Sequence, residues 1–255
     1  AIYKDVDTSV IGPVRSSRHY FLDYALENDA IYAHYGWSTY AENDIKALGV
    51  DNINGLYDDA FYRDSSIAAP HNVFTSIDNL YLMAEELGYD TTSSDYENLN
   101  YVTKKVNLEK KDNSLNCDGD NCSLEGRVLT SIEIPYSNSE VRSYTYDSEK
   151  GYYLRYMNGI PHTDRDTGEQ YHYKNIIIMK VDNSTLDDYG RQDLDTVGSG
   201  EGYYITNGYM MPITWEKDSR SGKTYYSYSN GDEIEVSDGN TFIQVMPSDR
   251  DIVVS

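Results

Sequence analysis

The second half of the chain carries a repeated signal for β-hairpins. Three Asn-Gly pairs, Asn158-Gly159, Asn207-Gly208 and Asn230-Gly231, each lie between tyrosine-rich runs of strand-forming residues. An Asn-Gly pair favours the two-residue turn that joins antiparallel strands, because both residues tolerate positive φ. From residue 128 onward helical periodicity is absent and β-rich runs alternate with turn residues. The pattern predicts a mainly antiparallel β domain that is almost free of α-helix.

Short runs rich in β-branched and aromatic residues supply the strands that these turns would join. The longest apolar run, from Ile176 to Met179, has the length of a strand and is far too short to span a bilayer. The predicted strands of this half span residues 133–136, 142–146, 152–157, 175–181, 202–206, 211–215, 224–228 and 242–245.

The N-terminal part differs, because apolar residues recur there at helical spacing. Residues 76–87 form the clearest predicted helix, which Gly88 ends. Another helix opens with a capping box from Thr39 to Glu42 and ends at Gly49. A third spans residues 16–28 behind a serine cap, and residues 30–34 form a short strand.

Together these patterns predict an α+β protein. An N-terminal layered α/β domain is followed by a mainly antiparallel β C-terminal domain, and a polar segment with a cysteine loop joins them as a linker or long excursion. The predicted domains are residues 1–103 and 128–255, with residues 104–127 between them.

Composition limits the partners of the chain. The formal net charge is −22, from 43 acidic and 21 basic residues, so the chain would repel nucleic acid and anionic membrane surfaces. Tyr outnumbers Phe 27 to 4, and a tyrosine can pack its ring while its hydroxyl stays wet. This bias fits half-buried β-sheet surfaces, and it also suits polar ligands such as sugars or peptides.

The two cysteines lie close together in a polar, glycine-containing loop. Cys117 and Cys122 are predicted to form a small disulfide ring, which implies an oxidising compartment. Their spacing is not that of a redox motif or a zinc knuckle, and no His-Glu-x-x-His motif occurs. The sequence predicts neither a metal site nor a cofactor.

Scarce basic residues gather in two segments. Arg15, Ser16 and Arg18 lie at the start of the first predicted helix, where backbone N–H groups and guanidinium groups could bind an anion. Helix-spaced pairing of these arginines with Asp23 and Glu27 would instead make them structural.

The second segment holds Arg63, Asp64, His71 and Asn72 in one loop. A His with an Asp to orient it can act as general acid or base, although Asp, Ser and Asn also cap their own turns. His34, at a predicted strand end, is another catalytic candidate. We predict that the basic residues of both segments, with Asp64, converge at one edge of the first domain.

A glycine-rich run, residues 198–202, does not match a dinucleotide fingerprint or a P-loop, because it lies between strands and not before a helix. It is interpreted as a flexible turn.

Several of these segments resemble the YerB-like lipoproteins, and the resemblance covers nearly the whole chain. It rests on Ile11 to Arg18, His34-Tyr35-Gly36, Arg63 to Ser66 with Pro70-His71-Asn72, Asp195 to Gly200, Ile213-Thr214-Trp215 and Thr241 to Pro247. It implies two domains, a larger one and a smaller C-terminal one. It also implies an extracytoplasmic protein of a Gram-positive-type bacterium, tethered through a lipidated Cys that would precede Ala1. The family has no established biochemical function, and the cysteine loop and high Tyr count are not part of its pattern.

Three functions remain open on this basis. The first is binding of an anionic or carbohydrate-like cell-envelope ligand through Arg15, Ser16, Arg18, Arg63 and Asn72. The second is hydrolysis of such a ligand, with His71 or His34 as acid or base and Asp64 orienting it. The third is a protein-interaction scaffold that uses the tyrosine-rich β surface.

Overall fold

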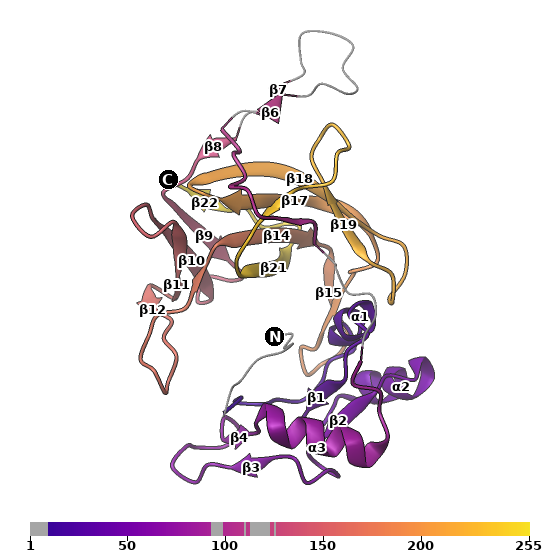
Figure 1. Ribbon diagram of the computed structural model, residues 1–255. Helices are drawn as coiled ribbons and strands as arrows, with labels where there is room; N and C mark the ends of the chain where they lie inside the picture. Colours follow the sequence, from indigo (N-terminus) through magenta and orange to yellow (C-terminus); the bar gives the residue numbers. More distant parts are fainter. Residues whose placement is uncertain (1–9, 93–98, 110, 113–122, 125) are drawn as a thin grey trace. The chain divides into compact units, whose positions relative to one another are not determined.

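The computed structural model describes residues 10–92, 99–109, 111–112, 123–124 and 126–255 (Figure 1). The chain divides into two compact units. Unit 1 comprises Ala1–Glu97 with Ser219–Lys223, and unit 2 comprises Asn98–Asp218 with Thr224–Ser255. Within the described residues the protein is mostly β and has three helices, all of them in unit 1. As predicted, residues 126–255 contain no helix.

Unit 1 alternates short strands with helices. The first two strands pair in parallel and the next two pair antiparallel. Its elements are α1 (Phe21–Glu27), β1 (Tyr32–His34), α2 (Thr39–Leu48), β2 (Asn52–Asn54), β3 (Tyr62–Arg63), β4 (Val73–Phe74) and α3 (Ile77–Leu87).

Helices α2 and α3 begin and end close to the predicted residues, and only the N-cap of α2 differs. The Ser76 hydroxyl accepts from Asn79 N at 3.2 Å at the start of α3, and Gly88 ends the helix with φ of 74°. Helix α2 ends at Gly49 as predicted, but its cap is Ser38 and not Thr39. Ser38 has extended backbone and its hydroxyl accepts from Ala41 N, so the capping group lies one residue earlier.

Helix α1 is shorter than predicted. It begins at Phe21, because Ser17 forms a parallel bridge with Trp37. Ser17 N donates to Gly36 O at 2.8 Å, and Ser38 N donates to Ser17 O at 3.2 Å. Neither Ser16 nor Ser17 caps the helix, so the predicted placement of Arg15 and Arg18 at a helix N-terminus is wrong.

Residues Ser219–Lys223 contribute an arginine to unit 1. Arg220 Nε donates to Asp23 Oδ1 at 2.5 Å, and Nη1 donates to Asp44 Oδ2 at 2.6 Å. The Asp23 side chain is only 6% exposed. Its carboxylate therefore pairs with an arginine distant in sequence, and the pairing of Asp23 with Arg15 or Arg18 is not observed.

Unit 2 contains two six-stranded sheets (Figure 1). One has the order β12-β11-β10-β9-β22, with β13 on β11, and the other has the order β19-β18-β17-β14-β21, with β8 on β18. Only the β14–β21 pair is parallel within these sheets. The strands are β5 (Tyr101–Val102), β6 (Lys111–Asp112), β7 (Ser123–Leu124), β8 (Arg127–Val128), β9 (Ser131–Pro135), β10 (Val141–Asp147), β11 (Tyr152–Met157), β12 (Ile160–Pro161), β13 (His172–Tyr173), β14 (Asn175–Val181), β15 (Asn183–Thr185), β16 (Gln192–Leu194), β17 (Gly198–Thr206), β18 (Tyr209–Lys217), β19 (Thr224–Ser227), β20 (Val236–Ser237), β21 (Thr241–Pro247) and β22 (Val253–Val254).

Two of the three Asn-Gly pairs form the predicted hairpin tips. Asn158 and Gly159 have φ of 51° and 77° between β11 and β12, and Asn207 and Gly208 have φ of 52° and 85° between β17 and β18. Positive φ at both positions defines the turn that matches strand twist. Asn230-Gly231 instead lies in a wider turn, which the isolated antiparallel bridge between Ser227 and Glu233 closes, and the strand that follows, β20, pairs with β5.

Strand β14 supplies the centre of the core, because its two faces enter different clusters. Ile177 and Met179 pack with Tyr204 and Trp215, whereas Ile178 packs in the other cluster. Two side chains of the predicted linker, Val106 and Leu108, are also fully buried in the first cluster. That segment is therefore core in part, because its apolar residues cover one face of the sheet.

Three tyrosines, Tyr144, Tyr153 and Tyr204, are fully buried, which goes beyond the half-buried role predicted for them. Tyr144 Oη donates to Gln244 Oε1 at 2.8 Å, and Tyr204 Oη donates to Asn175 Oδ1 at 3.2 Å. Gly208 N donates to the Tyr153 hydroxyl at 2.8 Å. A buried hydroxyl with a partner avoids the desolvation penalty, so tyrosine can replace phenylalanine in this core.

Candidate functional site

Part of the predicted convergence occurs in unit 1. Arg15 Nη1 lies 3.0 Å from His71 Nδ1, and Arg63 Nη1 donates to Asn72 Oδ1 at 2.8 Å. The Arg63 guanidinium carbon lies 4.8 Å from the centre of the Tyr35 ring. We call Arg15, Tyr35, Arg63, His71 and Asn72 the Arg15–Arg63 cluster.

Backbone pairing brings the two halves of this cluster together. The segment before Arg15 runs beside β4, with Val14 N donating to Val73 O at 2.8 Å. Tyr35 N in turn donates to Arg15 O at 3.0 Å. Arg63 ends β3, which pairs with β4, so both arginines lie at the same short hairpin.

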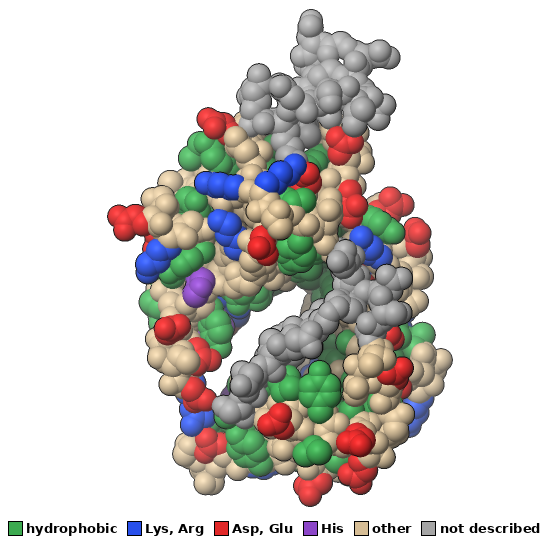
Figure 2. Space-filling view, viewed as in Figure 1, with side chains coloured by type: hydrophobic (Ala, Val, Ile, Leu, Met, Phe, Trp, Pro, Cys, Tyr) green, Lys and Arg blue, Asp and Glu red, His purple; other side chains and the backbone are tan. Residues whose placement is uncertain are grey.

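The described partners of these two arginines are an imidazole, an amide and an aromatic ring, and not carboxylates. A guanidinium can only donate, so the His71 ring nitrogen accepts. Among the described residues neither Arg15 nor Arg63 takes part in an ion pair, and no carboxylate bonds the His71 ring. Acidic side chains are scattered over the face shown in Figure 2 and not gathered in one patch. Arg15, Arg63 and His71 are exposed. The two guanidinium groups therefore form a small cationic patch on a chain whose formal net charge is −22.

Ser16 and Arg18 interact with their own segment. Arg18 Nη1 donates to Ser16 Oγ at 2.8 Å and to Ser17 O at 2.9 Å. Asp64 Oδ1 accepts from Ser66 N at 2.8 Å and from Ser66 Oγ at 2.5 Å, which organises the turn after β3. The roles predicted for these residues in ligand binding and in orienting a histidine stay predictions.

His34 is fully buried. Its Nδ1 lies 2.9 Å from Gly36 O and its Nε2 lies 3.0 Å from Asn52 Oδ1, while its ring stacks on Tyr32 at 5.2 Å. These contacts fix β1 beside β2. Because both ring nitrogens face protein oxygens, we assign His34 a structural role.

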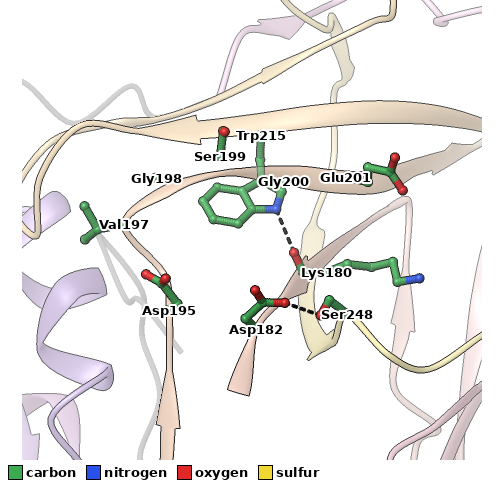
Figure 3. A pocket seen from close by; sticks show the side chains of 10 residues that line it. All are labelled: Lys180, Asp182, Asp195, Val197, Gly198, Ser199, Gly200, Glu201, Trp215 and Ser248. Carbon is green, nitrogen blue, oxygen red and sulfur yellow. Dashed lines mark hydrogen bonds between the residues drawn. The ribbon is translucent and has the colours of Figure 1, made fainter. Parts of the chain in front are cut away.

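A pocket lies in unit 2, where the sequence predicts a flexible turn (Figure 3). That prediction is wrong, since Gly198–Thr206 is strand β17 and pairs with β18 along its length. The cavity is about 290 Å³ and is lined by Lys180, Asp182, Asp195, Val197, Gly198, Ser199, Gly200, Glu201, Trp215 and Ser248.

The glycine run shapes this pocket through Trp215. An added Cβ at Gly200 would lie 2.6 Å from Trp215 Nε1, and that nitrogen donates to Lys180 O at 2.9 Å. Asp182 accepts from the Ser248 hydroxyl (Figure 3). With three carboxylates and one ammonium, the pocket does not suit an anion. Asp195 belongs to one of the motifs that resemble the YerB-like lipoproteins, whereas nothing in the sequence distinguishes Asp182 and Glu201 among the 43 acidic residues.

Two negative findings apply to the described residues only. They contain no group of three or more His, Cys, Asp or Glu side chains placed to hold a metal ion. None of their helices has the length and apolar character required to cross a membrane. Cys117 and Cys122 lie outside the described residues, so the predicted disulfide stays a prediction.

The chain matches both domains of the family described as "Protein of unknown function (DUF3048)", the N-terminal domain over residues 1–90 and the C-terminal domain over residues 132–243. It therefore belongs to this family. It is 27% identical over 252 residues to the Bacillus subtilis (strain 168) protein named "Putative lipoprotein YerB", covering 97% of this chain and 70% of that protein.

A solved structure extends this similarity to three dimensions. The crystal structure of the YerB protein from Bacillus subtilis has a TM-score of 0.78 to this chain at 26% identity, covering 96% of this chain and 77% of that one. The resemblance to YerB-like lipoproteins that the sequence motifs indicate is thereby confirmed.

Proposed function

We propose that the chain is the ectodomain of a lipid-anchored bacterial lipoprotein that binds an anionic cell-envelope ligand at the Arg15–Arg63 cluster. The name of the Bacillus subtilis relative supports the location. Unit 1 would then be the ligand-binding domain, because all residues of the Arg15–Arg63 cluster belong to it.

The binding proposal rests on the exposure of Arg15 and Arg63 and on the kind of groups that they contact. Arg15 and Arg63 are exposed and contact an imidazole, an amide and an aromatic ring, and no described carboxylate pairs with them. Arginine binds carboxylate and phosphate bidentately, with two parallel hydrogen bonds. Nearby Asn72 could donate from its amide nitrogen, because its oxygen is taken by Arg63. An oxyanion is the group that this arrangement fits best.

Arg63→Gln tests the proposal in a titration with inorganic phosphate and with glucuronate, a sugar carboxylate. Loss of one charge-assisted pair should weaken binding roughly ten-fold. Lys46→Gln is the matched control, since Lys46 lies in unit 1, is 67% exposed and pairs with Glu42 at 2.7 Å. Equal affinity of the Arg63 variant and unmutated protein for both ligands would refute binding at this cluster.

The location has its own test. Radiolabelled palmitate should enter the full-length protein in its bacterial host, and the protein should sediment with membranes. A full-length protein that stays unlabelled and remains in the cytoplasmic fraction would refute the lipoprotein proposal while leaving anion binding to be judged separately.

A further inference from the structure

A second group of basic side chains lies on one face of a sheet in unit 2. Arg142 is on β10 and Arg155 on β11, and the antiparallel register places Tyr144 opposite Arg155. Arg142 and Tyr144 are two residues apart and therefore share a face, which makes the two arginines diagonal neighbours. His162, just after β12, donates its backbone N–H to Arg155 O at 3.0 Å. No function was predicted from the sequence for Arg142, Arg155 or His162.

Arg155 lacks a countercharge among the described residues. Its guanidinium carbon lies 4.4 Å from the centre of the Phe242 ring. Its Nε is buried and has no hydrogen-bond partner in the described structure. Arg155 is half-buried, and a charge that is partly withdrawn from water is stabilised when an anion pairs with it.

The described side chains next to Arg155 do not supply the countercharge that its guanidinium lacks. Arg142 donates to Glu140 Oε2 at 2.8 Å, but Glu140 is 52% exposed, so the pair is a surface one that contributes little. His162 Nδ1 is also buried without a partner in the described residues, while its ring packs on Tyr171 at 4.6 Å. Two buried nitrogen atoms, one on β11 and one just after β12, thus have unused hydrogen-bonding capacity.

We propose that Arg142, Arg155 and His162 form an oxyanion-binding site on unit 2 that takes a carboxylate or a phosphate group. Tyr136 and Tyr173, both half-buried, belong to the same surface as Arg155 and Phe242. The site is distinct from the Arg15–Arg63 cluster, which lies in the other unit.

The charges around His162 explain how the site would respond to an anion. Burial lowers the pKa of His162 below its usual value of 6.5, and the nearby Arg155 and Arg142 charges lower it further. Its ring also packs on Tyr171, whose hydroxyl donates to Asp164 Oδ2 at 3.1 Å. An anion between the arginines and the ring would favour the imidazolium, so binding should raise the pKa of His162.

The proposal is tested by a residue-resolved NMR titration of the whole chain with inorganic phosphate and, separately, with acetate. Signals of β10, β11 and His162 should shift, and the tighter of the two anions identifies the preferred oxyanion. Arg155→Gln should weaken this binding roughly ten-fold. Arg250→Gln, which removes a 44% exposed arginine of the same unit, should leave it unchanged. If Arg155→Gln binds both anions as the unmutated protein does, the site does not exist.

The unmutated protein supplies a second measurement, which decides the matter even if the Arg155 variant fails to fold. The His162 ring should titrate at higher pH in saturating phosphate or acetate than in chloride. An identical titration in all three salts would overturn the proposal. Residue-specific signals also separate this result from binding at Arg15 and Arg63.

Discussion

Gly200 lies against the indole of Trp215, and this contact explains why a glycine stands in the middle of β17. A Cβ at position 200 would lie 2.6, 2.8 and 2.9 Å from three indole atoms. Trp215 is 3% exposed, packs in the core and donates to Lys180 O, so the ring can withdraw only by breaking that hydrogen bond and its core contacts. The glycine run is therefore a packing requirement of the strand.

We expect Gly200→Ala to lower the free energy of unfolding of unit 2 by about 1–3 kcal/mol, as overpacking does in other cores. Ser199→Ala is the control, because Ser199 is exposed in the same strand and should change stability by less than about 0.5 kcal/mol. Urea unfolding monitored by tryptophan fluorescence measures both. Equal stability of the two variants would show that the indole moves aside at little cost.

At the scale of elements, the two Asn-Gly hairpins differ in what their asparagines bind. Asn158 is exposed, and its side chain accepts from Val141 N at 2.7 Å. Asn207 is 7% exposed, accepts from Lys174 Nζ at 2.8 Å and donates to Val106 O at 2.9 Å. It thereby fastens the segment around Val106 to the β17–β18 hairpin.

Substitution of each asparagine by alanine separates turn geometry from these buried bonds, because both residues have positive φ. Asn158→Ala should cost about 1 kcal/mol, whereas Asn207→Ala should cost roughly 3 kcal/mol because it leaves buried groups without partners. Denaturant midpoints give the comparison. Similar losses for the two variants would mean that the Asn207 side chain contributes nothing beyond the turn.

Elements set by local chemistry were predictable from the sequence. The Ser76 cap, the glycines after α2 and α3, and two hairpins follow from residues next to one another in the chain. The later start of α1, at Phe21 and not at residue 16, was not predictable from the sequence. It follows from the bridge between Ser17 and Trp37, which are distant in the chain. The sequence predicted that Arg15 lies near His71 only from the clustering of scarce basic residues in two turn-rich segments of an acidic chain. Arg142 and Arg155 lie in separate strands, so their meeting depends on register alone.

For the molecule as a whole, the buried tyrosines make stability sensitive to alkaline pH. Burial raises the pKa of Tyr204 from 10.0 to about 12, against the opposing effect of its hydrogen bond from Ser237 N. Burial also raises the pKa of Tyr144 and Tyr153 above 10.0. The folded state therefore disfavours ionisation of these groups compared with the unfolded chain.

The sign of the effect follows from linkage. Since the folded pKa exceeds the unfolded one, the full stability is present below pH 10 and falls as the pH rises from 10 to about 12. Tyr204 alone accounts for a loss of roughly 2 kcal/mol across that window. Thermal unfolding followed by circular dichroism should show a falling Tm between pH 10 and 12. A melting temperature that stays level there would contradict burial of these hydroxyls.

The central claim is that the Arg15–Arg63 cluster of unit 1 holds an oxyanion. The most direct measurement is a crystal structure of this protein soaked in selenate, with an anomalous difference map calculated at the selenium edge. We expect a peak within hydrogen-bond distance of both Arg15 and Arg63 that disappears in Arg63→Gln crystals and persists in Lys46→Gln crystals. A map with no peak at the two guanidinium groups, or one unchanged by Arg63→Gln, would contradict it.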